Sequence, residues 1–190
     1  MNAITGVILA GGKSSRMGFD KGLAILNGKP MIQYVIDVFE KLGLDIIIIS
    51  NSPGYETFGY PIYNDLIPEK GPVGGIYTAL SRSTTDLNLI VSCDTPFLTL
   101  EVLKKLISQC VSNEITIAKF EGVEHPLIGI YSKKVRDVFK KKIDENKLKL
   151  KAICSELEAK IVPFSLGSHG VDDYTFNNIN TQEQLNSKGL

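Results

Sequence analysis

The chain has 190 residues, of which 43% are apolar and 22% are charged, as is typical of a soluble globular protein. This length suits one well-filled hydrophobic core and is short for two, so we expect a single domain over residues 1–190. Basic and acidic residues number 21 each, so no net field draws the protein to nucleic acid or to an anionic membrane. If the protein binds phosphate, the positive charge that attracts it must therefore come from a local group of residues.

The cysteines and the apolar runs bear on the cellular compartment. Cys93, Cys110 and Cys154 are odd in number, widely spaced and without a C-x-x-C pair, which argues against a disulfide framework and favours a reducing compartment. The longest apolar runs, such as 46–49, are far shorter than a membrane span. No basic region precedes the first apolar stretch, so the start of the chain is predicted to be a strand and not a signal peptide. We expect a cytoplasmic protein.

The first hundred residues alternate between apolar runs typical of strands and segments with helical spacing. A buried strand over 4–9 runs into a glycine-rich loop, and an extended piece with a turn at 27–30 precedes a helix over 31–42. The following segments are a strand over 45–50, an extended piece over 61–65, a helix opened by the glycines of 71–75, and a strand over 87–92. This alternation predicts a three-layer α/β/α, Rossmann-like fold with a mostly parallel sheet.

The second half of the chain continues the pattern. The predicted elements are a helix over 102–110, a strand over 115–119, a hairpin-like connection over 121–126, a strand over 127–131, two helices within 132–159, a strand over 161–164, and a strand within 176–181 followed by a capped helix with Glu183 and Gln184 in its first turn. The lysines between 140 and 151 alternate with acidic residues, so we interpret them as a solvated face and not as a nucleic-acid patch.

The loop after the first strand has the composition of a phosphate site. Glycine lets backbone N–H groups approach an anion closely, and Gly11 and Gly12 directly follow the strand end at Leu9 and Ala10. Arg16 offers a planar fork for phosphate oxygens, and Lys21 offers a mobile ammonium. The loop matches neither the dinucleotide nor the P-loop glycine motif, and a glycine pair taken alone would favour an ordinary turn.

Asp94 is the strongest single candidate for a catalytic residue. It follows the strand over 87–92, and Pro96 forces the chain out of the sheet two residues later. A carboxylate in this place could hold Mg²⁺, which prefers one or two carboxylates together with phosphate and water. The alternative is an aspartate that closes an Asx turn, and the upstream glycine loop with Lys21 favours the metal.

Other polar residues also follow predicted strands. Asp65 could accept hydrogen bonds from a guanine edge, and a glycine wall at 71–75 would let a planar base lie close to the backbone. Asn51 could contact ribose or base. All of these could equally be turn residues. Taken alone, the residues His125-Pro126 and Asn178 to Thr181 are explained by an ordinary histidine and by helix capping.

The thirteen residues from Leu9 to Lys21 read L-A-G-G-K-S-S-R-M-G-F-D-K. This run closely resembles the L-A-G-G-x-S-x-R-M-G-x-D-K motif of the molybdenum cofactor guanylyltransferases, the MobA family of nucleotidyltransferases with the GT-A-like fold. Further matches cover nearly all of the chain: C-D-T-P at 93–96 resembles the family's metal-site segment, and G-P-V-G-G at 71–75 is similar to its G-P-L-A-G. The related cytidylyltransferases carry L-A-A-G at the start of the loop, so guanine is preferred over cytosine.

The resemblance implies residue roles. Residues 1–100 would bind the nucleotide and 101–190 the acceptor. The catalytic residues would be Arg16, Lys21 and Asp94, with Asp94 also the metal ligand. The nucleotide-binding residues would be Leu9, Ala10, Gly11, Gly12, Lys21, Asn51, Asp65, Gly75 and Asp94, and the acceptor-binding residues would be His125, Pro126, Asn178 and Asn180. One departure concerns 147–151, where many relatives carry arginine and this chain has three lysines, which lack the bidentate fork.

The implied activity is Mg²⁺-dependent transfer of GMP from GTP to molybdenum-bound molybdopterin, with release of pyrophosphate. The implied protein partners deliver molybdopterin or mature molybdoenzymes. A cytidylyl or sugar-phosphate nucleotidyltransferase is the alternative within the enzyme class, because these enzymes share L-A-x-G, the lysine and the aspartate. A nucleotide-binding protein without turnover is the alternative from another class, but it would have no use for Arg16, Lys21 and Asp94 together.

Overall fold

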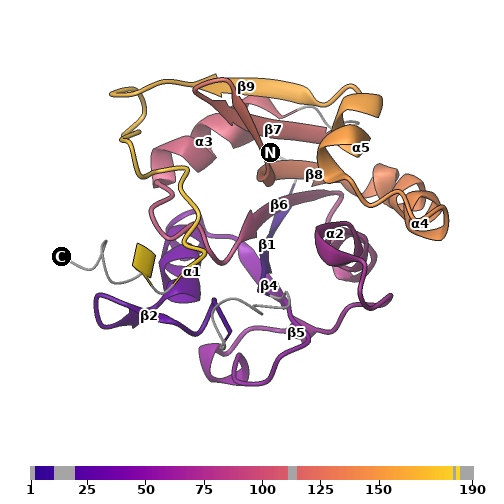
Figure 1. Ribbon diagram of the computed structural model, residues 1–190, viewed down its shortest axis with the longest axis horizontal. Coiled ribbons are helices and arrows are strands. Elements are labelled where there is room, and N and C mark those ends of the chain that lie inside the picture. Colours follow the sequence, from indigo (N-terminus) through magenta and orange to yellow (C-terminus); the bar gives the residue numbers. More distant parts are fainter. Residues whose placement is uncertain (1–2, 11–19, 111–114, 182, 185–190) are drawn as a thin grey trace.

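A seven-stranded sheet with helices on both faces forms the body of the protein, seen in a computed structural model that describes residues 3–10, 20–110, 115–181 and 183–184 (Figure 1). The strands are β1 Ile4–Leu9, β2 Ile25–Leu26, β3 Lys29–Pro30, β4 Asp45–Ile49, β5 Ile62–Tyr63, β6 Leu87–Ser92, β7 Ile115–Phe120, β8 Val123–Ser132 and β9 Lys160–Phe164. The helices are α1 Met31–Lys41, α2 Gly71–Arg82, α3 Leu100–Gln109, α4 Arg136–Asp144 and α5 Leu150–Glu156, with 3₁₀ turns η1 Glu56–Phe58 and η2 Lys133–Val135.

The sheet has the strand order β5-β4-β1-β6-β8-β7-β9. The pairs β4–β5, β1–β4, β1–β6 and β7–β9 are parallel, and only β8 runs against its neighbours β6 and β7. The parallel strands of the first half therefore end at one edge of the sheet. This confirms the predicted three-layer α/β/α fold with a mostly parallel sheet.

Two apolar clusters, one on each face of the sheet, hold the layers together. Ile46 and Ile48 point into the cluster under α1 and α3, whereas Ile47 and Ile49 point into the cluster under α2, α4 and α5. Figure 1 shows the two helical layers on opposite sides of the strands. Because side chains alternate along a strand, a continuous run of isoleucines buries both faces, which is the reason for a sheet covered on both sides.

The connection after β7 is shorter than predicted. Glu121 and Gly122 both have positive φ, 47° and 80°, and form a two-residue turn, so β8 begins at Val123 instead of near Leu127. A bulge separates the pairs Ala118–His125 and Ile117–Gly129 and takes up Pro126, which has no N–H to give to the ladder.

The prediction of a strand within 176–181 is wrong. This segment pairs with no strand among the described residues, and Phe176 instead stacks on Phe120 with 5.0 Å between the ring centroids. Ile179 is buried with Met31 and Leu26 of the β2–β3 region. The predicted capping is present, because Thr181 Oγ1 accepts a hydrogen bond of 3.2 Å from Gln184 N.

Two smaller expectations can be compared with the structure. Cys93, Cys110 and Cys154 all carry free thiols, as predicted. Within the described residues, no helix combines the length and the apolar character that crossing a bilayer requires.

The packing of β1 against α1 makes a testable prediction. A Cβ on Gly6 would lie 2.6 Å from Cδ2 of the fully buried Phe39. We expect Gly6→Ala to lower the free energy of unfolding by about 1–3 kcal/mol through overpacking, measured by urea denaturation. Combining it with Phe39→Leu should cost less than the sum of the two single losses, because the smaller side chain makes room. Strictly additive losses would contradict this contact.

Candidate active site

The candidate site lies at the edge where β1, β4, β5 and β6 end. Hydrogen bonds continue the pairing just past the strand ends, from Ala10 N to Ile49 O at 2.9 Å and from Cys93 N to Leu9 O at 3.1 Å. Leu9 and Ala10 are buried between these neighbours. Asp94 therefore leaves the sheet beside the end of β1, at the edge where open α/β sheets bind ligands.

Three residues far apart in the sequence meet at this edge. Lys21 Nζ lies 3.5 Å from Asp94 Oδ2 and donates a hydrogen bond of 2.5 Å to Asn180 Oδ1. The side chain of Asp94 is only 11% exposed and that of Lys21 is 26% exposed. Ile179 N donates to Asp94 O at 2.9 Å, which fixes the C-terminal segment beside the aspartate. Asn180 was predicted on the acceptor side, and the structure brings it to Lys21 and Asp94.

The turn around Asp94 bears on the two interpretations of this residue, a metal ligand or the first residue of an Asx turn. Thr95 closes the turn, since both its N–H and its hydroxyl donate to Ser92 O, at 3.3 and 2.7 Å. The Asp94 carboxylate does not form an Asx turn with the described residues. Its Oδ1 is buried and has no hydrogen-bond partner among them. An unpaired carboxylate oxygen in this position has the chemistry of a cation ligand.

Asp65 is the second carboxylate of the site. It is tied to Asn51 by two hydrogen bonds of 2.8 Å, from Asp65 N to Asn51 Oδ1 and from Asn51 Nδ2 to Asp65 Oδ2. Its Oδ1 is buried without a partner among the described residues. Burial raises the pKa of Asp65, and the hydrogen bond from Asn51 opposes this rise.

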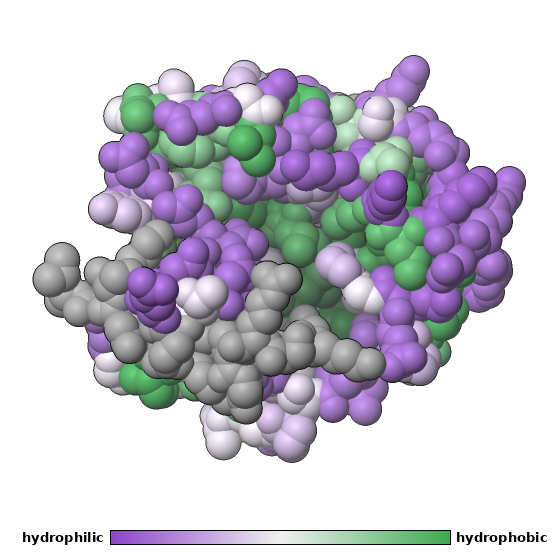
Figure 2. Space-filling model, in the orientation of Figure 1, coloured by the Kyte–Doolittle hydropathy of each residue, from purple (hydrophilic) through white to green (hydrophobic). Residues whose placement is uncertain are grey.

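Gly75 and Leu9 border Asp65. A Cβ on Gly75 would lie 3.3 Å from Leu9 Cδ2 and 3.9 Å from Asp65 Oδ1. Helix α2 is tied to the segment after Asp65, because Thr78 Oγ1 accepts from Leu66 N at 3.0 Å and donates to Gly74 O at 2.9 Å. Figure 2 shows a hollow with an apolar floor near the middle of the molecule, where Figure 1 has β6, the end of β1 and the side of α2.

The other predicted acceptor residues lie along β8 and the C-terminal segment. The half-buried His125 ring packs 5.1 Å from the ring of Phe176. Burial lowers the pKa of His125, and the positive charge of Lys151 acts in the same direction. Pro126 is buried, and its carbonyl accepts a hydrogen bond of 2.6 Å from Tyr131 Oη. Asn178 is exposed on the segment after Phe176.

Three predicted residues, Gly11, Gly12 and Arg16, lie outside the described residues. In contrast, the structure adds two residues that sequence reasoning missed. Asp20 Oδ1 accepts hydrogen bonds from the hydroxyl of Tyr55 and from Gly22 N. Asp20 stands inside the glycine-loop motif, which could have drawn attention to it, but nothing in the sequence connects it to Tyr55.

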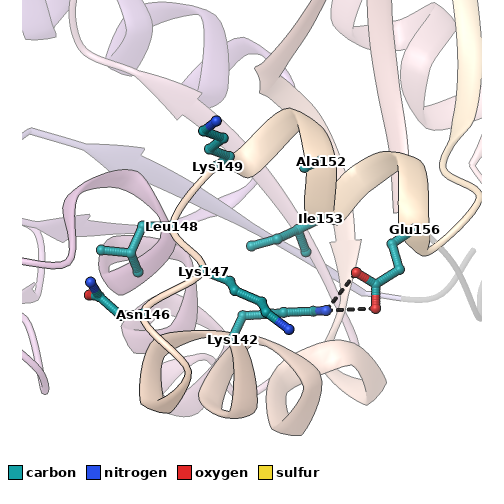
Figure 3. A pocket seen from close by; sticks show the side chains of 8 residues that line it. All are labelled: Lys142, Asn146, Lys147, Leu148, Lys149, Ala152, Ile153 and Glu156. Atoms are coloured by element: carbon teal, nitrogen blue, oxygen red, sulfur yellow. Dashed lines mark hydrogen bonds and ion pairs between the residues drawn. The ribbon is translucent and has the colours of Figure 1, made fainter.

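The lysine-rich segment lies at a different place on the surface. A pocket of about 330 Å³ opens between α4, α5 and the loop that joins them (Figure 3). It is lined by Lys142, Asn146, Lys147, Leu148, Lys149, Ala152, Ile153 and Glu156. The buried Lys142 pairs with Glu156 at 2.5 Å, and Lys147 pairs with Glu145 at 2.8 Å. Lys147, Lys149 and Lys151 are exposed, as expected of a solvated face, whereas Lys142 is buried and its ammonium is paired with Glu156.

Among the described residues, no group of three or more His, Cys, Asp or Glu side chains could hold a metal ion. A site built on Asp94 would combine one carboxylate with phosphate and water. This is the mode of binding that magnesium prefers at phosphate-transfer sites.

Comparison with known proteins bears on the meaning of this geometry. Residues 6–160 match the model of the MobA-like NTP transferase domain. The chain belongs to this family. It is therefore a nucleotidyltransferase, an enzyme class that generally uses a divalent metal.

Curated members of the family align along almost all of the chain. A Flavobacterium johnsoniae protein named "Probable molybdenum cofactor guanylyltransferase" is 41% identical over 191 residues, with 100% of this chain and 98% of that protein covered. The molybdenum cofactor guanylyltransferase of Desulfosudis oleivorans is 32% identical, with 97% and 94% covered. The structure of molybdopterin-guanine dinucleotide biosynthesis protein A from Archaeoglobus fulgidus superposes with a TM-score of 0.75 at 23% identity, covering 97% of this chain and 96% of that one, and supports the same fold.

The environment of Asp65 predicts an effect on stability. Because its pKa is raised on folding, the ionised carboxylate destabilises the folded state at neutral pH. We expect Asp65→Asn to raise the free energy of unfolding at pH 7, by less than about 1 kcal/mol because solvent screens this half-buried group. The gain should shrink as the pH falls through the folded-state pKa, and disappear below the unfolded-state pKa.

Urea denaturation at several pH values measures this effect. Asp45→Asn is the control, because Asp45 is exposed at the start of β4. A clear loss of stability in Asp65→Asn at pH 7 would contradict the account.

Proposed function

We propose that this chain transfers GMP from GTP to molybdenum-bound molybdopterin and releases pyrophosphate. The names of its full-length relatives support this proposal. The observation that carries it is the pair of carboxylates Asp65 and Asp94, which follow β5 and β6 at one edge of the sheet and each keep one buried oxygen without a hydrogen-bond partner among the described residues. We assign the base to Asp65, which lies beside Asn51 and Gly75, and the cation to Asp94.

Guanine fits the Asp65 side of the site. Its Watson–Crick edge presents two adjacent N–H donors, and a carboxylate is an acceptor with two oxygens. Asn51 holds Asp65 Oδ2, so that Oδ1 is left for the base, and the Gly75 backbone leaves room for a flat ring beside Leu9. Cytosine presents an acceptor next to its amino donor, which would face the carboxylate unfavourably. This favours GTP over CTP.

Asp94 is the proposed ligand of Mg²⁺. The fit rests on its buried Oδ1, which has no hydrogen-bond partner among the described residues. When bound, the ion would neutralise charge on the α- and β-phosphates of the nucleotide.

The proposed reaction needs positioning more than proton transfer. An oxygen of the acceptor phosphate forms a bond to the α-phosphorus of GTP, the bond from that phosphorus to the bridging oxygen breaks, and pyrophosphate leaves with the electron pair. The attacking group is already an anion, so no general base is required. Lys21 stabilises the negative charge that develops on the departing pyrophosphate, and Arg16 with the glycines 11 and 12 holds the triphosphate.

The acceptor is proposed to lie against His125, Pro126, Asn178 and Asn180. The contact between Asn180 and Lys21 supports an acceptor position close to the reacting phosphates. In this proposal residues 1–100 bind the nucleotide and 101–190 the acceptor, in the cytoplasm, with partner proteins that deliver molybdopterin or receive the product.

Turnover of purified variants tests the function. The assay follows transfer of label from α-³²P-GTP to molybdenum-loaded molybdopterin and the release of pyrophosphate. We expect Asp94→Ala and Lys21→Ala to lower kcat by about 100-fold or more, because each removes charge stabilisation from the transition state. Both variants should keep a melting temperature close to that of the wild type, since the ion pair is long, at 3.5 Å, and its Lys21 side chain is 26% exposed.

Asp37→Ala is the matched control, because Asp37 pairs with Lys29 at 2.5 Å on α1. It should keep its kcat within about twofold of the wild type, as expected for a surface change. Normal turnover in Asp94→Ala would contradict the proposal, and so would transfer from CTP in preference to GTP.

A further inference from the structure

The Asp20 carboxylate joins a buried tyrosine to the backbone on either side of Lys21. Tyr55, which is fully buried just before η1, donates its hydroxyl proton to Asp20 Oδ1. Gly22 N donates to the same oxygen at 3.0 Å. Lys21 lies between Asp20 and Gly22 in the sequence, inside the turn that the hydrogen bond from Gly22 N closes. A change at Tyr55 therefore acts directly on the turn that carries Lys21.

Gly22 has no room for a side chain in this arrangement. A Cβ at Gly22 would overlap the Tyr55 hydroxyl and lie 3.2 Å from Cys93 Sγ. The carbonyl of Gly22 accepts a hydrogen bond of 2.9 Å from Ile32 N in α1. Three elements therefore contact this turn: Tyr55 from the connector after β4, Cys93 after β6, and Ile32 at the start of α1.

The Tyr55 hydroxyl keeps its proton. Burial raises the pKa of Tyr55 far above its usual value, and the hydrogen bond to Asp20 acts in the same direction. Tyr55 is therefore a hydrogen-bond donor throughout the physiological range.

A fixed backbone matters for a lysine more than for most residues. Its ammonium is carried on a flexible four-carbon stem, and holding such a side chain in one place costs conformational entropy. With its backbone fixed, Lys21 reaches both Asp94 Oδ2, at 3.5 Å, and Asn180 Oδ1, at 2.5 Å. A displaced turn would move the ammonium away from the triphosphate, and small misplacements of a charged group lower the rate of reaction strongly.

We propose that Tyr55 is a positioning residue for Lys21. Its hydroxyl holds Asp20, and the Asp20–Gly22 turn aims the Lys21 ammonium at the phosphates of the bound nucleotide. The catalytic consequence rests on the proposed nucleotidyl transfer, whereas the placement of Lys21 does not.

Tyr55→Phe tests this role, because it removes the hydroxyl and keeps the buried ring. We expect kcat to fall about tenfold, the effect of losing one hydrogen bond to a charged group, while KM for GTP changes less than twofold. Tyr60→Phe is the matched control: it lies in the same connector and also donates to a carboxylate, Glu40 Oε1, at 2.5 Å, but on the surface. Its kcat should not change.

A double-mutant cycle separates positioning from general structural damage. If Tyr55 acts through Lys21, Tyr55→Phe should cause no further loss of kcat in a Lys21→Ala background. A tenfold loss in both backgrounds would overturn the proposal, and so would full kcat in the single variant.

A second measurement reads the placement of Lys21 without any turnover. In the nucleotide-free protein, the rate of acylation of each lysine by an amine-reactive ester is followed by mass spectrometry. We expect Lys21 to react several-fold faster in Tyr55→Phe than in the wild type, because its ammonium is no longer held between Asp94 and Asn180, whereas Lys29 serves as an internal reference. If the wild type transfers no nucleotide, the proposed function fails, and this rate still decides the role of Tyr55: an unchanged rate at Lys21 overturns it.

Discussion

The parallel pairing of β1 between β4 and β6 is the constraint on which the rest of the structure depends. Hydrogen bonds from Ala10 to Ile49 and from Cys93 to Leu9 extend this pairing beyond the strands. Because parallel strands end at a common edge, the loops that follow them converge there. The isoleucines of β4 and their neighbours supply the core on both faces. The strands and helices supply most of the core, so that polar residues of the loops, such as Asp65 and Asp94, can serve the site.

The site consists of polar groups that the fold leaves incompletely paired. Asp65 and Asp94 each keep a buried oxygen without a partner among the described residues, an arrangement that costs stability unless a ligand completes it. Lys21 is the cationic group of this site, and its ammonium lies between the side chains of Asp94 and Asn180. Such local conflicts with folding are expected where binding and catalysis take place. The C-terminal segment contributes directly, since Ile179 and Asn180 both contact this group.

Sequence reasoning succeeds here where the signal is local. The bounds of β1 and β6 are as predicted, because each is a continuous apolar run that ends at a polar or glycine-rich segment. It fails for the segment around Phe176 and Ile179, whose apolar side chains suit a strand but pack on Phe120 and Met31 instead. The contact of Lys21 with Asn180 spans 159 residues, and that of Asp20 with Tyr55 spans 35. No local pattern encodes such pairs, so only the folded chain reveals them.

Nucleotide selectivity is the most direct test of the central claim, that this edge of the sheet is a guanine nucleotide site completed by a divalent ion. Isothermal calorimetry of the purified protein with GTP, CTP, ATP and UTP, each with and without Mg²⁺, measures it in one set of titrations. The account predicts that GTP binds at least about tenfold more tightly than the other nucleotides, because only guanine pairs its N–H donors with Asp65, and that Mg²⁺ strengthens binding. Preference for another nucleotide, or equal binding of all four, would contradict it.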